Sequence, residues 1–245
     1  MPRSSQYLQE GYTYHLTHRC HNREFLLRFA RDRNAYRKWL REGVRRHNVS
    51  IYGFCITSNH VHIIAHVDNV EDVGNLMQLA AGSTAKQYNI RKSHLGSLWE
   101  HPYQCTMIQD GRHLFNCLCY VDLNMVRAGA VSHPTEWNWC GYNELIGKRA
   151  RFRILDTDRL LESLEIDDLQ KFRTNYIDAI NRRLANHNNT REAHWTESLA
   201  VGSKGFTEQC RSLYSRRSQF DIYENHGTDI NTWIIKEPPT SYGSI

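Results

Sequence analysis

The sequence predicts an α+β fold, and three observations support this prediction. Four short segments are rich in aromatic and β-branched residues, which favour strands: residues 12–19, 49–57, 60–67 and 104–108. Two longer segments, 32–47 and 73–88, place apolar residues at helical spacing, and a third helix is predicted from about Gly111 to the stop at Ala128-Gly129. The order β-α-β-β-α-β-α begins with a ferredoxin-like split βαβ arrangement, an antiparallel four-stranded sheet with helices on one face.

The first predicted helix has two distinct faces. Tyr36, Trp39, Leu40 and Val44 recur at helical spacing and predict the buried face. The opposite face is basic: Arg33, Arg37, Lys38, Arg41, Arg45 and Arg46. This pattern fits either an ordinary solvated face or a face that contacts phosphates.

The second and third strands predict a hairpin across the short turn Ser58-Asn59. The helix that follows ends in a basic group, Lys86, Arg91 and Lys92.

The chain divides into two predicted parts, residues 1–149 and 150–245. The second part is predicted to be a mainly helical extension, with helices at 156–164, 167–186 and 196–201. About the last 25 residues, which include Pro238-Pro239, are predicted to form an extended tail.

Composition and charge narrow the class of protein. The chain has 245 residues, is 40% hydrophobic and has no apolar run near the roughly 20 residues that a membrane helix needs. Its start lacks the apolar stretch of a signal peptide, so a cytoplasmic protein is expected. Residues 1–150 hold 18 Lys and Arg against 12 Asp and Glu, while residues 151–245 hold 13 against 14. The basic excess lies in the first part and favours a polyanionic partner there.

The seven cysteines have irregular spacing and include no CxxC pair, which favours buried free thiols over disulfides or a zinc site. This usage fits a reducing compartment.

The segment Asn59-His60-Val61-His62 carries the first chemical signal. Residues i and i+2 of a strand point to the same face, so His60 and His62 are predicted side by side, about 7 Å apart at Cα. Two such imidazoles can converge on one divalent ion. A pair of solvent-facing histidines with no ligand is the alternative.

The segment from Cys119 to Gly129 carries the second signal. On a helix, Tyr120 and Asn124 lie on one face, one turn apart. An Asn oxygen suits Mg²⁺ or Mn²⁺, and with two imidazoles it would give an N,N,O ligand set with open positions. A helical tyrosine that only packs is the alternative.

These residues resemble the REP-associated tyrosine transposases of the HUH single-strand DNA transposase superfamily. The resemblance is carried by three segments: Ser58-Asn59-His60-Val61-His62, Leu98-Trp99-Glu100 with Tyr103, and Tyr120 to Gly129. It spans about residues 3–147 and ends in the segment Trp137 to Tyr142. Met125 departs from the family pattern, which usually has proline at that position, and no reactive group is lost.

The resemblance implies an enzyme with a specific site. Tyr120 would attack a phosphorus of single-stranded DNA and form a 5′-phosphotyrosine, with His60, His62 and Asn124 holding Mg²⁺ or Mn²⁺. DNA-binding candidates are Arg19, Arg23, Arg37, Arg41, Lys86, Arg91 and Arg127.

The resemblance also implies a partner and a setting. The partner would be hairpin DNA from repetitive extragenic palindromes. The protein would be nucleoid-associated in a bacterial cytoplasm, with no membrane contact, and a monomer is favoured over a homodimer. Two alternatives stay open: a palindrome-binding DNA or RNA module that does not cut, and a metal-dependent phosphodiesterase in which water attacks.

Overall fold

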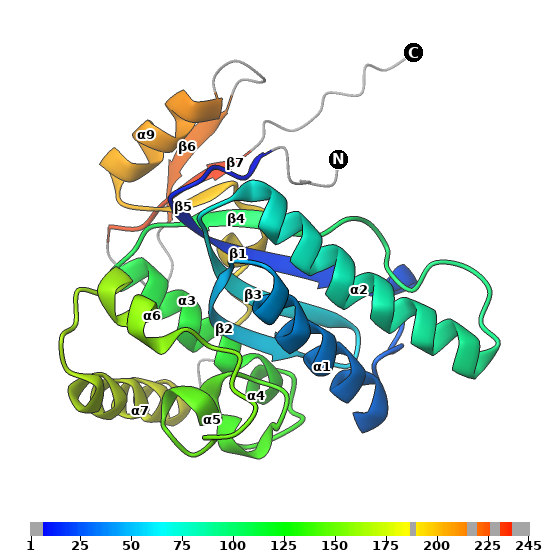
Figure 1. Ribbon diagram of the computed structural model, residues 1–245. Coiled ribbons are helices and arrows are strands. Elements are labelled where there is room, and N and C mark those ends of the chain that lie inside the picture. Colours follow the sequence, from blue (N-terminus) through cyan, green and yellow to red (C-terminus); the bar gives the residue numbers. More distant parts are fainter. Residues whose placement is uncertain (1–6, 187–189, 215–219, 226–230, 237–245) are drawn as a thin grey trace, which may run out of the picture.

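The computed structural model describes residues 7–186, 190–214, 220–225 and 231–236. Its central feature is one seven-stranded sheet with the order β2-β3-β1-β4-β5-β7-β6 (Figure 1). The first four strands along the chain are β1 (Tyr12–Arg19), β2 (Ser50–Ile56), β3 (His60–Val67) and β4 (Gln104–Ile108). They pair antiparallel, as the sequence predicts. The α+β class is confirmed, but the sheet is larger than the four strands predicted.

Helices α1 (Ala30–Arg46) and α2 (Val70–Lys92) lie side by side over one face of the sheet (Figure 1). Their contact is close, because a Cβ at Gly43 of α1 would lie 3.1 Å from Cγ of Leu76 on α2. Tyr36 and Leu40 are fully buried, as the helical spacing predicts. Asn69 caps α2, and its side chain accepts hydrogen bonds from the backbone N–H groups of residues 71 and 72.

The two helices of the split βαβ unit, α1 and α2, share one face as predicted, and helix α3 (Arg112–Asp122) packs against the opposite face of the sheet. The tyrosine on α3, Tyr120, makes edge-on ring contacts with His15 of β1 and His62 of β3. The single helix predicted from residue 111 is interrupted at Leu123 (φ −81°, ψ 0°) and continues as α4 (Asn124–Arg127). The break is small, because Leu123 N–H still bonds to the carbonyl of residue 119.

The remaining elements complete the chain. They are η2 (His21–Arg23), η3 (Pro134–Glu136), α5 (Tyr142–Leu145), α6 (Thr157–Ser163), α7 (Leu169–Ala185), α8 (His194–Glu197), β5 (Ala200–Gly202), α9 (Lys204–Tyr214), β6 (Asp221–Glu224) and β7 (Trp233–Lys236).

The described C-terminal part is mainly helical, as predicted, and it also adds three strands to the sheet. Strand β5 pairs parallel with β4, with Ala200 opposite Met107, so the sheet is mixed rather than wholly antiparallel. The predicted helix 196–201 is therefore wrong: the chain forms α8 and then enters β5. The exposed edge of β4 explains this, since Met107 N–H bonds to the carbonyl of Leu199 at 2.8 Å and satisfies the edge.

The predicted tail also contains β6 and β7, which form an antiparallel pair. Residues 226–230 and 237–245 of that tail, which include Pro238-Pro239, lie outside the described residues.

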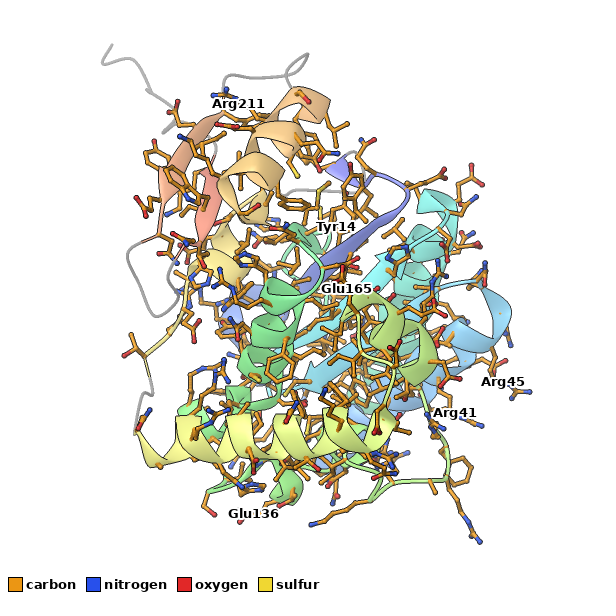
Figure 2. All side chains as sticks on the ribbon, turned by 90° about the vertical axis from the view of Figure 1, so that its left-hand side faces the viewer. Tyr14, Arg41, Arg45, Glu136, Glu165 and Arg211 are labelled. Atoms are coloured by element: carbon orange, nitrogen blue, oxygen red, sulfur yellow. The ribbon has the colours of Figure 1, made fainter. Side chains whose placement is uncertain are left out.

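Both predicted parts share one core. Tyr14 of β1 lies inside the molecule near α9 (Figure 2), and its hydroxyl is 3.5 Å from that of Tyr214. All seven cysteines are buried and free, in agreement with the prediction. Among the described residues, no helix has the length and apolar character to cross a bilayer.

Candidate metal and tyrosine site

His60 and His62 stand on one face of β3, at the end that follows the Ser58-Asn59 turn. Their ring centroids are 4.7 Å apart, as the i, i+2 spacing predicts. In the register with β1, Arg19 lies opposite His60 and Thr17 lies opposite His62. His62 is only 2% exposed, so neighbouring residues cover most of its side chain.

Hydrogen bonds orient both imidazoles. His62 Nδ1 lies 2.8 Å from His15 Nε2, and His15 Nδ1 lies 2.8 Å from the backbone carbonyl of Trp195. His60 Nδ1 lies 2.7 Å from Asn59 Oδ1 and 3.0 Å from Thr57 Oγ1. Each site histidine thus has its Nδ1 engaged by protein, which leaves both Nε2 atoms for the site.

The helical segment brings the other two candidates to the same place. Asn124 Nδ2 lies 3.0 Å from His62 Nε2. Tyr120 is 4% exposed, and its ring centroid lies 6.1 Å from that of His62 and 6.3 Å from that of Trp195. The structure therefore gathers all four residues predicted for catalysis and metal binding.

A cavity of about 350 Å³ joins these residues. It is lined by Arg19, His60, His62, Tyr120, Asn124, Arg127, Ala128, Arg191 and Thr196. Among the described residues that line it, three arginines thus surround two imidazoles and a phenol, and none is a carboxylate. Such a cavity suits an anion.

Arg127 is the arginine most closely tied to Tyr120. Its guanidinium carbon lies 4.1 Å from the centroid of the Tyr120 ring, and its Nη2 donates to the Tyr120 backbone carbonyl at 2.6 Å. Burial raises the pKa of Tyr120 above its ordinary value of about 10, whereas Arg127 and Arg191 act to lower it. The arginines therefore reduce the cost of forming the phenolate in a buried place.

The site histidines are held neutral. Burial lowers the pKa of His15 to about 4, and burial together with Arg19 lowers the pKa of His60 to about 3. The pKa of His62 is also well below its ordinary value, through burial and the neighbouring His60. A neutral imidazole is the form that binds a metal ion.

These lowered pKa values predict acid sensitivity. Below pH 6.5 the unfolded chain binds protons that the folded site refuses, so stability falls as the pH drops toward 4. For His15 and for His60, we expect a loss of about 2 kcal/mol each in the free energy of unfolding between pH 7 and pH 5. Urea unfolding at the two pH values measures it. His15→Gln should reduce the total loss by the amount that one histidine contributes, about 2 kcal/mol. A free energy of unfolding that does not change between pH 7 and pH 5 would contradict the prediction.

The residues fit a divalent cation. Two neutral imidazoles present unprotonated Nε2 atoms, and a half-turn of the Asn124 amide would place its oxygen where Nδ2 lies. The amide oxygen suits Mg²⁺ or Mn²⁺, and with the two imidazoles it would give an N,N,O ligand set with open positions. Within the described part of the chain, no cluster of three or more His, Cys, Asp or Glu side chains is arranged for a metal, so the set rests on two histidines and an amide.

The seven predicted DNA-binding residues separate into two groups. Arg19 and Arg127 line the cavity, and Arg23 lines a second cavity beside it. Arg37, Arg41, Lys86 and Arg91 belong to α1 and α2, on the other face of the sheet.

Three residues of that second group have local partners. Arg37 donates to the carbonyl of Asn138, Arg41 lies over the Phe152 ring, and Arg91 pairs with the buried Asp32. Figure 2 shows Arg41 and Arg45 at the outer side of the molecule. A role in DNA binding for the second group, Arg37, Arg41, Lys86 and Arg91, stays a prediction.

The sequence analysis missed four residues of the site. His15, Thr196, Trp195 and Arg191 each touch or line it. His15 had a signal, because His15, Thr17 and Arg19 alternate along one face of the first strand. The other three residues carry no such signal in the sequence. They belong to the C-terminal part, which reaches the site because β5 pairs with β4.

The chain is similar to known proteins in two comparisons. Residues 9–122 match the family model described as "Transposase IS200 like". The matched stretch contains His60, His62 and Tyr120 and ends two residues before Asn124. No curated protein matches the chain significantly.

Seven chains among the solved structures match. One is described as "Structure of the REP associates tyrosine transposase bound to a REP hairpin"; it is 16% identical, and the alignment covers 64% of this chain and 94% of that one, with a TM-score of 0.49. Over residues 9–122 this chain is thus similar to the IS200-like transposases.

Proposed function

We propose that this protein is a metal-dependent single-stranded DNA endonuclease and strand transferase that uses Tyr120 as its nucleophile on hairpin DNA. One observation carries the proposal: Tyr120, His60, His62 and Asn124 line a single cavity ringed by arginines. The family match over residues 9–122 supports it.

His60, His62 and Asn124 are the proposed ligands of Mg²⁺ or Mn²⁺. A divalent ion bound there would polarise the scissile phosphate and offset the charge that builds on its oxygens. Arg127 and Arg19 contribute positive charge to the same cavity. The neutral His60 and His62 accept no proton, so their part is to bind.

The proposed chemistry is a transesterification. The Tyr120 oxygen loses its proton and forms a bond to phosphorus, while the bond from phosphorus to the leaving 3′-oxygen breaks and that oxygen takes up a proton. The 5′-phosphotyrosine keeps one ester bond for the one broken, so another 3′-hydroxyl can reverse the step and join a different strand.

The tyrosine acts in cis in this proposal. Tyr120 and the ligands come from one chain, with the Tyr120 and His62 rings 6.1 Å apart. A single chain therefore assembles the whole set, which supports a monomer as the acting form.

The DNA path is proposed to continue into the neighbouring cavity of about 340 Å³. The two cavities share Arg19, Arg191 and Thr196. Thr17, Arg23 and Gln104 extend the lining, which also includes the carboxylates of Glu100 and Glu197. Phosphates on either side of the scissile bond would meet arginines along this path.

Exposed aromatic residues lie in the loop that contacts the Ser58-Asn59 turn before β3. Phe25 and Phe29 are 66% and 54% exposed, and Arg28 and Lys92 lie over the Phe29 ring. Their loop is tied to the turn before β3, since Leu27 N–H bonds to the carbonyl of Ser58. Exposed aromatic rings beside cations suit unpaired bases, so this patch is the proposed contact for single-stranded DNA next to the hairpin.

The test is a covalent capture experiment. Purified protein is incubated with 3′-end-labelled hairpin DNA from palindromes that flank its own gene, with Mn²⁺ or with chelator, and resolved on a denaturing gel. We expect metal-dependent transfer of label to protein. Binding with neither cleavage nor adduct would instead support a non-catalytic module.

Arg191 offers a separate test of the DNA path. It lies at the junction of the two cavities, so Arg191→Gln should weaken binding of single-stranded DNA about 10-fold and lower the salt slope by about one. Fluorescence anisotropy at several salt concentrations measures both quantities. The matched control is Arg45→Gln, because the Arg45 side chain is 66% exposed on α1 and lies outside both cavities. Equal losses in the two variants would argue against the path.

A further inference from the structure

We propose that His15 is a positioning residue, which fixes His62 in the tautomer that binds metal, and that the backbone carbonyl of Trp195 sets this arrangement. The metal role of His62 rests on the proposed function. The tautomer itself does not, because it is a property of the metal-free protein.

The three groups form a buried chain. His15 and His62 are 1% and 2% exposed, and Trp195 is fully buried. The contacts from the Trp195 carbonyl oxygen to His15 Nδ1 and from His15 Nε2 to His62 Nδ1 are both 2.8 Å, which is hydrogen-bond distance. The two rings are also stacked, with centroids 5.0 Å apart and planes 20° from parallel.

The direction of this chain follows from its first member. A carbonyl oxygen only accepts, so His15 Nδ1 carries the proton and donates. A neutral imidazole has one N–H, which leaves His15 Nε2 as an acceptor. His62 Nδ1 must then donate to it, and His62 Nε2 is left with a lone pair that faces Asn124 and the cavity. If His15 carried its proton on Nε2 instead, the lone pair of its Nδ1 would face the lone pairs of the Trp195 carbonyl oxygen at 2.8 Å, which is repulsive.

The carbonyl that starts the chain is held firmly. The Trp195 indole N–H donates to Glu192 at 2.8 Å, and its ring lies 6.3 Å from that of Tyr120. Three residues on, the Ser198 carbonyl accepts from the Thr106 hydroxyl of β4 at 2.7 Å. The C-terminal part, outside the family match, therefore orients a metal ligand within the matched part.

A metal-free tautomer measurement tests the inference directly. Long-range ¹H–¹⁵N correlation spectra distinguish Nδ1–H from Nε2–H imidazoles. We expect His15 and His62 both to be Nδ1–H at neutral pH. A His62 that is Nε2–H would overturn the inference, whatever the protein does to DNA.

Metal affinity gives the second readout. His15→Phe keeps an aromatic ring but removes the acceptor, so Mn²⁺ affinity measured by calorimetry should fall about 10- to 100-fold. His15→Gln supplies an amide oxygen to accept and an amide N–H to donate, and it should restore most of the affinity. His18→Phe is the matched control: His18 is buried on the other face of β1 and stacks on Trp99, so this variant should bind Mn²⁺ as the wild type does.

The outcomes separate the two proposals. Folded His15→Phe with wild-type Mn²⁺ affinity would overturn the positioning role. Wild-type protein that binds no Mn²⁺ would overturn the proposed metal chemistry, while the tautomer spectrum would still decide the role of His15. If His15→Phe does not fold, the spectrum and the Gln variant still test the inference.

Discussion

Replacing Tyr120 with phenylalanine should abolish the covalent protein–DNA adduct, with a fall in strand cleavage of at least about 1,000-fold. The change removes only the hydroxyl. The ring keeps its contacts with His15, His62 and Trp195 and its place under Arg127. Hairpin binding and Mn²⁺ affinity should therefore stay within about threefold of the wild type, since neither depends on the lost atom.

The measurement is the denaturing gel with Mn²⁺, run beside anisotropy for binding. Tyr223→Phe is the matched control, because Tyr223 is 45% exposed on β6, away from the cavity. If Tyr120→Phe still cleaves at the wild-type rate, water rather than tyrosine is the nucleophile, and the protein is a metal-dependent phosphodiesterase.

The parts of the fold that depend on local pattern could be predicted from sequence. The alternation within residues 12–19 and 60–67 and the pentapeptide 104–108 give strands with the predicted bounds. The helices over the sheet need only apolar residues at helical spacing, as at Tyr36 and Leu40.

The rest depends on tertiary pairing. Ala200 and Val201 become a strand because the free edge of β4 offers them hydrogen bonds, and nothing within residues 196–201 signals that edge. The same holds for β6 and β7, which extend the sheet from β5.

The site divides along the same line. His60 and His62 share a face through strand spacing, and Tyr120 and Asn124 share one through helix spacing, so each pair is visible in sequence. That the two pairs meet was supplied by a family resemblance rather than by spacing. His15 and Arg191 required the fold, because their roles depend on which segments lie across from β3 and α3.

Replacing His62 should have the other large effect. His62 is the more buried of the two candidate histidine ligands and the one that contacts both His15 and Asn124. His62→Ala removes one of three ligands and leaves His15 without its donor. We expect Mn²⁺ affinity to fall by at least about 100-fold, with loss of the adduct at metal concentrations that saturate the wild type.

The design separates loss of metal from loss of fold. His62→Gln retains a polar group that can donate to His15, so it should unfold near the wild-type urea midpoint while still losing most of its Mn²⁺ affinity. His66→Gln is the control on the same face of β3: His66 contacts Thr13 and Asp68 and lies about 13 Å from His62 along the strand. Its affinity and activity should be unchanged. If folded His62→Gln formed adduct as fast as the wild type, and did so in chelator, the cavity would work without a metal. The arginines that surround Tyr120 would then be the groups that stabilise the phosphate charge.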